Sequence, residues 1–264
     1  MTSTTTDVDE LTRIARGAEA WRLATAAYDA LLELLTSLLA EEWEQPTVCQ
    51  PWTVADTVRH LLGAAQAHAS IPEFLRQQTW ALRHKGEFDD NALDAWTGLH
   101  VRRHAELGPQ HLLERLRETA PRAVHARSRF PALLGRIAVP VDATGNTAAG
   151  SPAKVTLGEL NTVIFTRDTW LHRIDIARAI GREPDLDRHV DGRIIEDVVI
   201  EWAQRHRTPF RLTLTGEAGG TYTHGSDGPL IELDAVEFAW ILSGRGEPAP
   251  DSSAAELLTT RLLF

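Results

Sequence analysis

The stretch TLGELNTVIFTRDTWLHRIDIARAIG (residues 156–181) carries signals for both ends of a single helix. Thr156 and Glu159 stand at the spacing of a capping box, and Gly181 is a residue type that commonly follows the end of a helix. At about 100° per residue, four polar side chains of this stretch fall within one arc of roughly 60°. They are Asn161, Asp168, His172 and Asp175. Apolar residues cover most of the remaining surface, so the pattern predicts a buried helix with one polar seam.

The polar seam needs partners, because a desolvated and unpaired carboxylate costs several kcal/mol. Asp168 and His172 lie one helical turn apart, so both side chains can reach a single ion. We interpret this pair as two ligands of a metal site. A buried hydrogen bond between the aspartate and the histidine, without a metal, would satisfy the same pattern.

Another histidine lies on a helix that is predicted to begin at the capping signature of Thr53 and Asp56. The residues beside His60 on that helix are small, among them Gly63 and Ala64, so they leave room next to the imidazole. A lone histidine on a helix is commonly a structural or exposed residue, and this interpretation stays open. The alternative is that His60 joins the pair on the first helix as a third ligand.

Composition excludes several classes of function. The 264 residues include 27 Lys and Arg against 37 Asp and Glu, a net charge of −10, which argues against general binding of nucleic acid or of a membrane surface. The one cysteine, Cys49, rules out a disulfide within the chain. No apolar run is long enough to cross a membrane, and the first residues do not resemble a signal peptide. We therefore expect a soluble cytoplasmic protein with neither nucleic-acid nor membrane partners; the sequence does not indicate its oligomeric state.

Helical periodicity dominates up to about residue 185 and changes after it, which predicts a mostly α fold in two domains. Residues 1–185 are predicted to form a helical bundle, and residues 186–264 a small α+β domain. The expected helices of the bundle span about 8–43, 53–70, 72–84, 90–107, 110–128 and 156–181. In the second domain, strands are expected at 210–216, 221–226 and 229–234, and helices at 188–205, 235–244 and 254–263. Residues 139–155 have the composition of a long loop.

Two segments of the chain resemble one known family. PTVCQPWTVADTVRHLL (46–62) and TRDTWLHRIDIARAIGR (166–182) resemble paired motifs of the mycothiol-dependent maleylpyruvate isomerase family. LDAVEFAWILSGRGEP (233–248) is similar to the sterol-carrier-protein-like second domain of the same family. The resemblance implies a DinB-like metal-binding four-helix bundle, of a kind found in actinobacteria, followed by the small α+β domain.

The resemblance also implies roles for individual residues. His60, Asp168 and His172 would be the metal ligands, although the family more often has glutamate where this chain has Asp168. The ion would be zinc, with nickel, iron or cobalt as alternatives for such a ligand set. Arg245 would contact the substrate or the thiol cofactor, unless it is a solvated loop residue. Independently of the resemblance, the place of Asp175 on the polar seam suggests that it accepts a hydrogen bond from a ligand imidazole.

Weaker candidates for that supporting role are Asn161 and Asp56. Cys49 falls in the connector between the first two long helices of the family, so we expect it to be structural and not a nucleophile.

These expectations lead to a functional hypothesis. The chain would be a metal-dependent enzyme in which mycothiol, a low-molecular-weight thiol, attacks a small electrophilic substrate as a metal-bound thiolate. The reaction would be a cis–trans isomerisation or an S-transfer, and the sequence does not choose between them. The main alternative is a non-catalytic regulatory protein that binds a metal or a small ligand. A metal hydrolase ranks last, because the chain lacks a hydrolase motif such as HExxH.

Overall fold

The computed structural model describes residues 5–140, 154–249 and 255–264, and these residues form two compact units. The helical unit contains residues 16–140 and 155–184. The sheet unit contains residues 5–15, 154, 185–249 and 255–264. The protein is thus a mostly α chain with a smaller α+β part, as its sequence pattern predicts.

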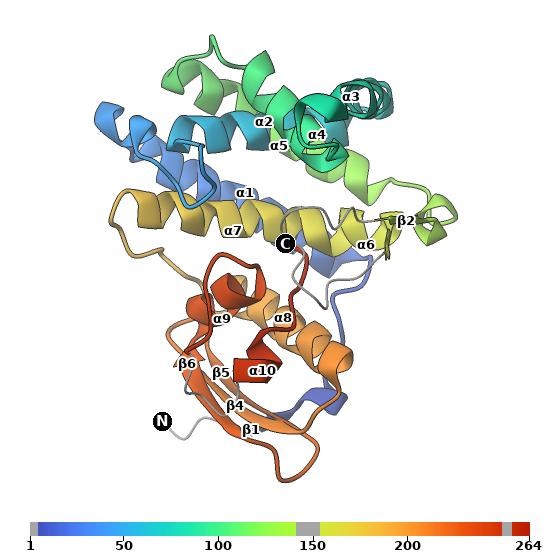
Figure 1. Ribbon diagram of the computed structural model, residues 1–264, viewed down its shortest axis with the longest axis vertical. Coiled ribbons are helices and arrows are strands. Elements are labelled where there is room, and N and C mark those ends of the chain that lie inside the picture. Colours follow the sequence, from blue (N-terminus) through green and yellow to red (C-terminus); the bar gives the residue numbers. More distant parts are fainter. Residues whose placement is uncertain (1–4, 141–153, 250–254) are drawn as a thin grey trace. The chain divides into compact units, whose positions relative to one another are not determined.

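Four helices of the helical unit pack side by side as a bundle (Figure 1). They are α1 (Ala18–Thr36), α2 (Val54–Ala69), α5 (Pro109–Ser128) and α7 (Phe165–Ala179). Each helix contributes an apolar stripe to one core, which includes Leu31, Leu62, Leu116 and Ile176. These side chains are buried almost completely, and their removal from water is the main stabilising contribution to the bundle.

Two further helices cover α2 on its outer side. α3 (Ile71–His84) and α4 (Ala92–Arg103) pack against α2 and against each other. Short 3₁₀ turns connect the helices: η2 (Ala40–Glu44), η3 (Lys85–Glu87) and η4 (Leu134–Arg136). The short strands β2 (Ala138–Pro140) and β3 (Lys154–Thr156) pair at the two ends of the predicted loop, whose remaining residues lie outside the described ones.

The stretch at 156–181 begins as predicted but does not continue as one uniform α-helix. The hydroxyl of Thr156 accepts a hydrogen bond from the backbone N–H of Glu159 at 3.1 Å, which caps α6 (Leu157–Glu159). A π-helical turn, η5 (Leu160–Ile164), then precedes α7. Such a turn shifts the angular position of every residue before it, so the predicted seam is interrupted at Asn161. The side-chain amide of Asn161 donates to the carbonyl of Leu157 at 2.7 Å instead of supporting a ligand.

A buried arginine of α5 supports the π-helical turn. The guanidinium of Arg127 donates to the carbonyl of Asn161 from Nε at 2.8 Å and from Nη2 at 2.6 Å. Nη2 also donates to the hydroxyl of Thr166 at 2.8 Å. Because the backbone bonds of a π-turn are wider than those of an α-helix, a side-chain donor at this carbonyl helps to keep the turn in place.

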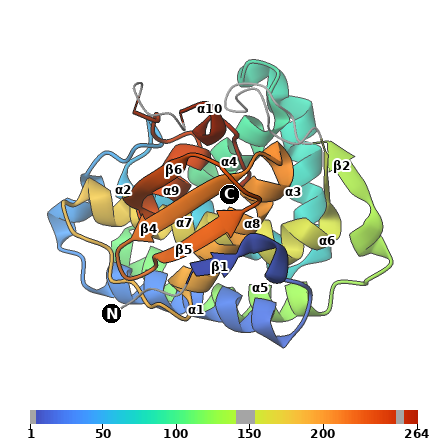
Figure 2. The same cartoon turned by 90° about the horizontal axis from the view of Figure 1, so that it is seen from below.

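The sheet unit is built on a four-stranded sheet with the order β1-β5-β4-β6 (Figure 2). The strands are β1 (Thr5–Asp7), β4 (Phe210–Thr215), β5 (Gly220–His224) and β6 (Leu230–Asp234). β4 pairs antiparallel with β5, whereas the pairs β1–β5 and β4–β6 are parallel. The helices α8 (Asp191–His206) and α9 (Ala235–Leu242) pack against the strands, and α10 (Ala255–Leu258) follows. The predicted helix at 254–263 is therefore correct only for its first residues.

The first residues of the chain differ from their predicted structure and domain. Thr5–Asp7 form β1, with Thr5 opposite Thr221 of β5, and Val8–Glu10 form the 3₁₀ turn η1. The first bundle helix begins only after Gly17. Residues 5–15 thus group with the sheet unit, although the helical pattern extends from residue 8 in the sequence. The strand conformation of this segment depends on its pairing with β5, which is distant in the sequence. The local hydrophobic period contains no information about such a pairing.

An ion-pair cluster fixes the N-terminal segment to α8. Arg13 contacts the carboxylate of Asp197 through Nε at 2.8 Å and that of Glu201 through Nη2 at 2.9 Å. The backbone N–H of Ile14 also donates to Asp197 at 2.7 Å. Both carboxylates are buried, so the cluster excludes water while it balances their charge.

Replacing Arg13 by alanine is expected to lower the free energy of unfolding by about 3 kcal/mol, because the change leaves buried carboxylates without this cation. Urea denaturation followed by circular dichroism would measure the loss. Arg211→Ala, at an exposed position on β4, is the matched control and should change stability by less than about 0.5 kcal/mol. If the two substitutions lowered the free energy of unfolding equally, the ion-pair cluster would not be the source of the stability lost in Arg13→Ala.

Among the helices that the structure describes, none is long and apolar enough to span a bilayer.

Candidate metal centre

The structure brings together the three side chains that the sequence suggests as ligands. His60 lies on α2, and Asp168 and His172 lie one turn apart on α7. The Nε2 atom of His60 is 3.7 Å from Oδ2 of Asp168, and the Nε2 atom of His172 is 3.5 Å from Oδ1 of Asp168. One donor atom from each residue lies within 4.8 Å of the others. Both imidazoles are buried, whereas the Asp168 side chain is 24% exposed.

These separations fit a single ion. Ligand atoms that lie 2.0–2.1 Å from a tetrahedral zinc are about 3.3 Å apart. The two distances from Asp168, each to a different carboxylate oxygen, are somewhat longer than that spacing and are too long for good hydrogen bonds. One donor atom from each of the three residues lies within 4.8 Å of the others, so a small movement would bring all three onto one ion. Two imidazoles and a carboxylate also form a donor set that zinc and other divalent transition metals accept. The residues therefore suit the metal that the sequence suggests.

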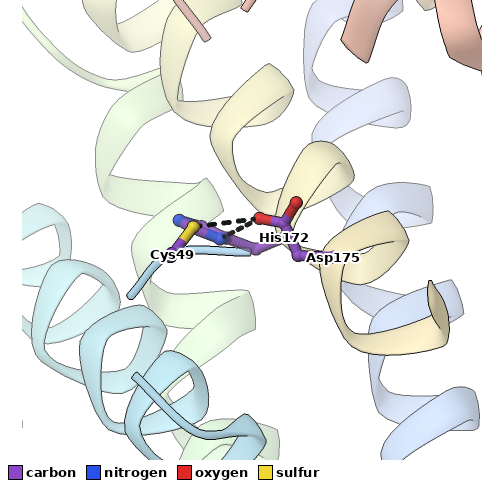
Figure 3. A group of neighbouring side chains, drawn as sticks. All are labelled: Cys49, His172 and Asp175. Atoms are coloured by element: carbon purple, nitrogen blue, oxygen red, sulfur yellow. Dashed lines mark hydrogen bonds and ion pairs between the residues drawn. The ribbon is translucent and has the colours of Figure 1, made fainter. Parts of the chain in front are cut away.

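Asp175 fixes the orientation of His172. Its Oδ2 atom accepts a hydrogen bond from Nδ1 of His172 at 2.8 Å (Figure 3). The carboxylate is 1% exposed and can only accept when it is ionised, so Nδ1 carries the proton. When the ring is neutral, as a metal ligand must be, its lone pair therefore lies on Nε2, the nitrogen that faces Asp168. The sequence predicts this supporting role for Asp175 from its place on the polar seam.

The electrostatic environment favours a positive charge between these residues. Burial opposes a charge on the imidazole of His172, but the Asp168 carboxylate and the hydrogen bond to Asp175 outweigh it and raise the pKa of His172 to about 10. In the metal-free protein a proton provides this charge. A divalent cation would satisfy the same preference, because the two carboxylates attract either one.

Cys49 belongs to a different group of possible donors, with His172 and Asp175. Its thiol donates to Oδ2 of Asp175 at 3.5 Å, the same oxygen that His172 approaches (Figure 3). The donor atoms of this second group are therefore already joined by hydrogen bonds through one carboxylate oxygen. We consider it the support of the first group and not an ion site.

The supporting roles suggested for Asp56 and Asn161 do not match the structure. The Asp56 carboxylate accepts from the backbone N–H of Thr53 at 3.2 Å and pairs with Arg59 at 2.8 Å. It thus caps the beginning of α2, one full turn before His60. Asn161 is engaged at the π-helical turn, as described above.

Sequence reasoning missed the residue that contacts His60. His100, on α4, is 1% exposed, and its Nδ1 atom lies 3.2 Å from Nδ1 of His60. It occupies the space that the small residues of α2 leave: a Cβ atom on Gly63 would lie 2.4 Å from Cγ of His100. The gap beside His60 is visible in the sequence, but the residue that fills it comes from a helix about 40 positions further along the chain.

An aromatic ring and a neutral imidazole lie close to the three ligands. The ring of Trp52 lies 5.1 Å from that of His60 and 6.5 Å from that of His172. On α2, His68 stacks on Phe165 at 3.8 Å, and burial together with Arg127 lowers the pKa of His68 to about 3. His68 is therefore uncharged near neutral pH, and it adds no positive charge to compete with a cation.

Arg245 lies in the sheet unit, directly after α9, and is partly buried. Its backbone N–H donates to the carbonyl of Trp240 at 3.1 Å. The guanidinium of Arg261 supports the same loop, because it donates to the carbonyl of Gly246 at 3.4 Å and contacts Glu247 at 3.2 Å. The loop is thus well anchored within its own unit, and the role of Arg245 toward substrate stays a prediction.

The chain thus combines a four-helix bundle, which carries a His–Asp–His donor set, with a small α+β unit. This combination is that of a two-part helical protein with a candidate metal centre in its bundle. The sequence model of the mycothiol maleylpyruvate isomerase N-terminal domain matches residues 21–177. The chain therefore belongs to the mycothiol-dependent maleylpyruvate isomerase family.

Known structures support the same fold. The crystal structure of the mycothiol-dependent maleylpyruvate isomerase is similar with a TM-score of 0.54 and 14% identity, over 94% of this chain and 94% of that chain. A histidine-to-alanine variant of that enzyme gives the same TM-score and identity, over 92% of this chain and 93% of that chain. At this identity the similarity establishes the fold. A search of curated proteins found no match to this chain.

Proposed function

We propose that this protein is a metal-dependent enzyme that uses a low-molecular-weight thiol, mycothiol, to act on a small electrophilic substrate. The observation that carries the proposal is the donor set of His60, Asp168 and His172, which offers three protein ligand atoms within 4.8 Å of one another. Three protein ligands leave a coordination position available, which is typical of catalytic and not of structural zinc sites. Membership of the isomerase family supports the thiol and the reaction class.

The ligands would hold zinc, or alternatively nickel, iron or cobalt. A divalent ion at this place would lower the pKa of a bound thiol and so favour its nucleophilic thiolate form near neutral pH. The protein's own contribution is to hold two Nε2 lone pairs and one carboxylate toward a common point. Asp175 keeps the His172 ring in place, and the ring of Trp52 lies beside both imidazoles.

Two reaction classes are compatible with this site, and they differ in their products. A cis–trans isomerisation returns the free thiol, whereas an S-transfer consumes it. Incubation of the purified protein with mycothiol and maleylpyruvate, followed by chromatography, would separate the two outcomes. The proposal requires metal in the purified protein, heat on titration with mycothiol, and product formation that a chelator abolishes; absence of metal would overturn it.

Arg245 is proposed to recognise the anionic substrate or the thiol. Arg245→Ala is expected to raise KM about tenfold or more, because a hydrogen bond to a charged group contributes about 1.5–3 kcal/mol. Arg245→Lys retains the charge and should lose less. Steady-state kinetics would measure both variants, and an unchanged KM in Arg245→Ala would show that the residue is only part of the loop.

Cys49 is proposed to act as a structural donor and not as the nucleophile. Cys49→Ala is expected to lower activity by less than about tenfold, because one hydrogen bond contributes about 1 kcal/mol. Cys49→Ser keeps a donor toward Asp175 and should be closer still to the wild type. A loss of more than about a hundredfold in both variants would instead indicate covalent chemistry at this thiol.

A non-catalytic binding protein is the second candidate. The feature that favours it is Asp168, because the family more often has the longer glutamate at this position. A regulatory protein of this kind would bind metal or a small ligand but would form no product with mycothiol. The chromatography experiment above distinguishes it from the enzyme.

A further inference from the structure

A chain of hydrogen bonds leads from the outer helices of the helical unit to His60. The indole Nε1 of Trp96 donates to Oε1 of Gln77 at 2.7 Å. The same oxygen lies 2.8 Å from Nε2 of His100, whose Nδ1 is 3.2 Å from Nδ1 of His60. Gln77 is completely buried and His100 almost so. The side chains contact one another directly, without bridging water.

Trp96 sets the donor-to-acceptor direction of these hydrogen bonds, because an indole can only donate. Oε1 of Gln77 is therefore an acceptor in this position. The amide orientation agrees on the other side, where Nε2 of Gln77 donates to the carbonyl of Gly63 at 3.2 Å and to Glu73 at 2.8 Å. Both of those partners are acceptors, so a flipped amide would place oxygen against oxygen at two contacts and would place its NH₂ group against the indole N–H of Trp96.

The roles of the two imidazoles follow from this orientation. Because Oε1 of Gln77 accepts, Nε2 of His100 must carry a proton. Among the described residues, the ring of His100 hydrogen-bonds to this amide and to His60 and packs against the edge of Trp96, and no carboxylate is in direct contact with it. A buried and uncompensated cation is unfavourable, so the ring is neutral and its Nδ1 is an acceptor. Nδ1 of His60 must then donate.

From this arrangement we infer that His100 is a positioning residue, which holds His60 in the tautomer with a proton on Nδ1 and a lone pair on Nε2. The Nε2 atom is the one that faces Asp168, at a distance too long for a good hydrogen bond. The hydrogen bond to Asp175 likewise places a proton on Nδ1 of His172, so both imidazoles turn Nε2 toward Asp168. The effect of His100 on metal binding rests on the proposed metal site, whereas the tautomers themselves follow from the hydrogen bonds alone.

The close approach of His100 to His60 depends on Gly63. Any side chain at this position would meet His100, since an added Cβ atom would lie within 2.6 Å of its Cβ atom and of two of its ring carbons. The glycine thus allows α4 to place an imidazole directly against a ligand on α2. This explains why the neighbourhood of His60 is made of small residues.

Nuclear magnetic resonance of the metal-free protein tests the tautomers directly. Protein labelled with ¹⁵N at histidine would be assigned with single-residue variants, and long-range ¹H–¹⁵N spectra distinguish the protonated from the unprotonated ring nitrogen. We expect His100 to be protonated at Nε2 alone and His60 to carry its proton on Nδ1. A His100 protonated on Nδ1 would overturn the inference, whether or not the protein binds metal.

Metal affinity tests the consequence. His100→Phe keeps a ring of similar shape but removes the acceptor, and is expected to weaken zinc binding by about 10–100-fold, as is typical for a lost partner of a ligand. His100→Gln can accept from His60 and donate to Gln77, so it should recover most of the affinity. His104→Phe is the matched control, because His104 is a buried histidine just beyond the same helix, and no hydrogen bond, ion pair or ring contact found among the described residues joins it to His60.

Competition with a chromophoric chelator would measure the dissociation constant for zinc in the wild type and in the three variants, and circular dichroism would confirm folding. Equal affinity in His100→Phe and in the wild type would overturn the inference. A wild type that binds no zinc would overturn the proposed function instead, while the tautomers would still be decided by the resonance experiment.

Discussion

Replacement of His172 by alanine is expected to reduce the bound divalent metal from about one equivalent per chain to a small fraction, and to abolish thiol-dependent turnover. The variant loses one of three protein ligands, and it also leaves the buried Asp175 carboxylate without its principal partner. With only His60 and Asp168 as protein ligands, two of the four coordination positions of zinc would have to be filled by water or substrate, instead of one. Metal analysis of the purified variant by mass spectrometry would measure the loss.

His104→Ala provides the control for this experiment. His104 is also buried in the helical unit, at 5% exposure, but no hydrogen bond or ion pair found in the described part of the chain joins its side chain to the three ligands. It should retain metal and activity. If His172→Ala kept its metal while remaining folded, the ion would have to lie elsewhere and the proposed centre would be wrong.

The metal-free protein is expected to be most stable near about pH 6.5 and to lose several kcal/mol of unfolding free energy between about pH 6.5 and pH 10. The folded protein holds a proton on His172 with a pKa of about 10, whereas the unfolded chain releases it near the ordinary value of 6.5. A raised pKa gives stability that is fully present below the unfolded value and disappears as the pH rises to the folded one.

Below about pH 6.5 the dependence should reverse. Burial lowers the pKa of His68 to about 3 and the pKa values of His104 and His206 to about 4, so the folded state resists protonation that the unfolded chain accepts. Urea denaturation of chelator-treated protein across this range would show both slopes. In His172→Ala the loss above about pH 6.5 should largely disappear. A flat profile in the wild type would mean that the carboxylates around His172 do not hold its proton.

Local signals explain why much of the site can be predicted. The capping residues Thr53 and Thr156 fix the beginnings of two helices, and the helical period places Asp168, His172 and Asp175 on one face. All of these relations lie within a few residues of the chain. They survive in the structure because α7 continues without interruption from Phe165 to Ala179.

The parts that could not be predicted depend on contacts between distant segments. His100 and Gln77 reach His60 from α4 and α3, and neither has a distinctive local pattern. The π-helical turn moves Asn161 off the seam, and its support comes from Arg127 on another helix. Such relations require the packed bundle.

The course of the chain has a consequence for how the sheet unit can be made. Its strand β1 precedes the entire helical unit in the sequence, while its other strands follow that unit (Figure 1). A recombinant fragment starting at Asp185 would lack β1 and would expose the hydrogen-bonding edge of β5, which invites aggregation. The residues from 16 to 184, by contrast, include the bundle without any of this sheet's strands and are the better choice for separate expression. During synthesis, the earliest strand must wait until more than 200 residues have emerged before its neighbour, Gly220–His224, is available.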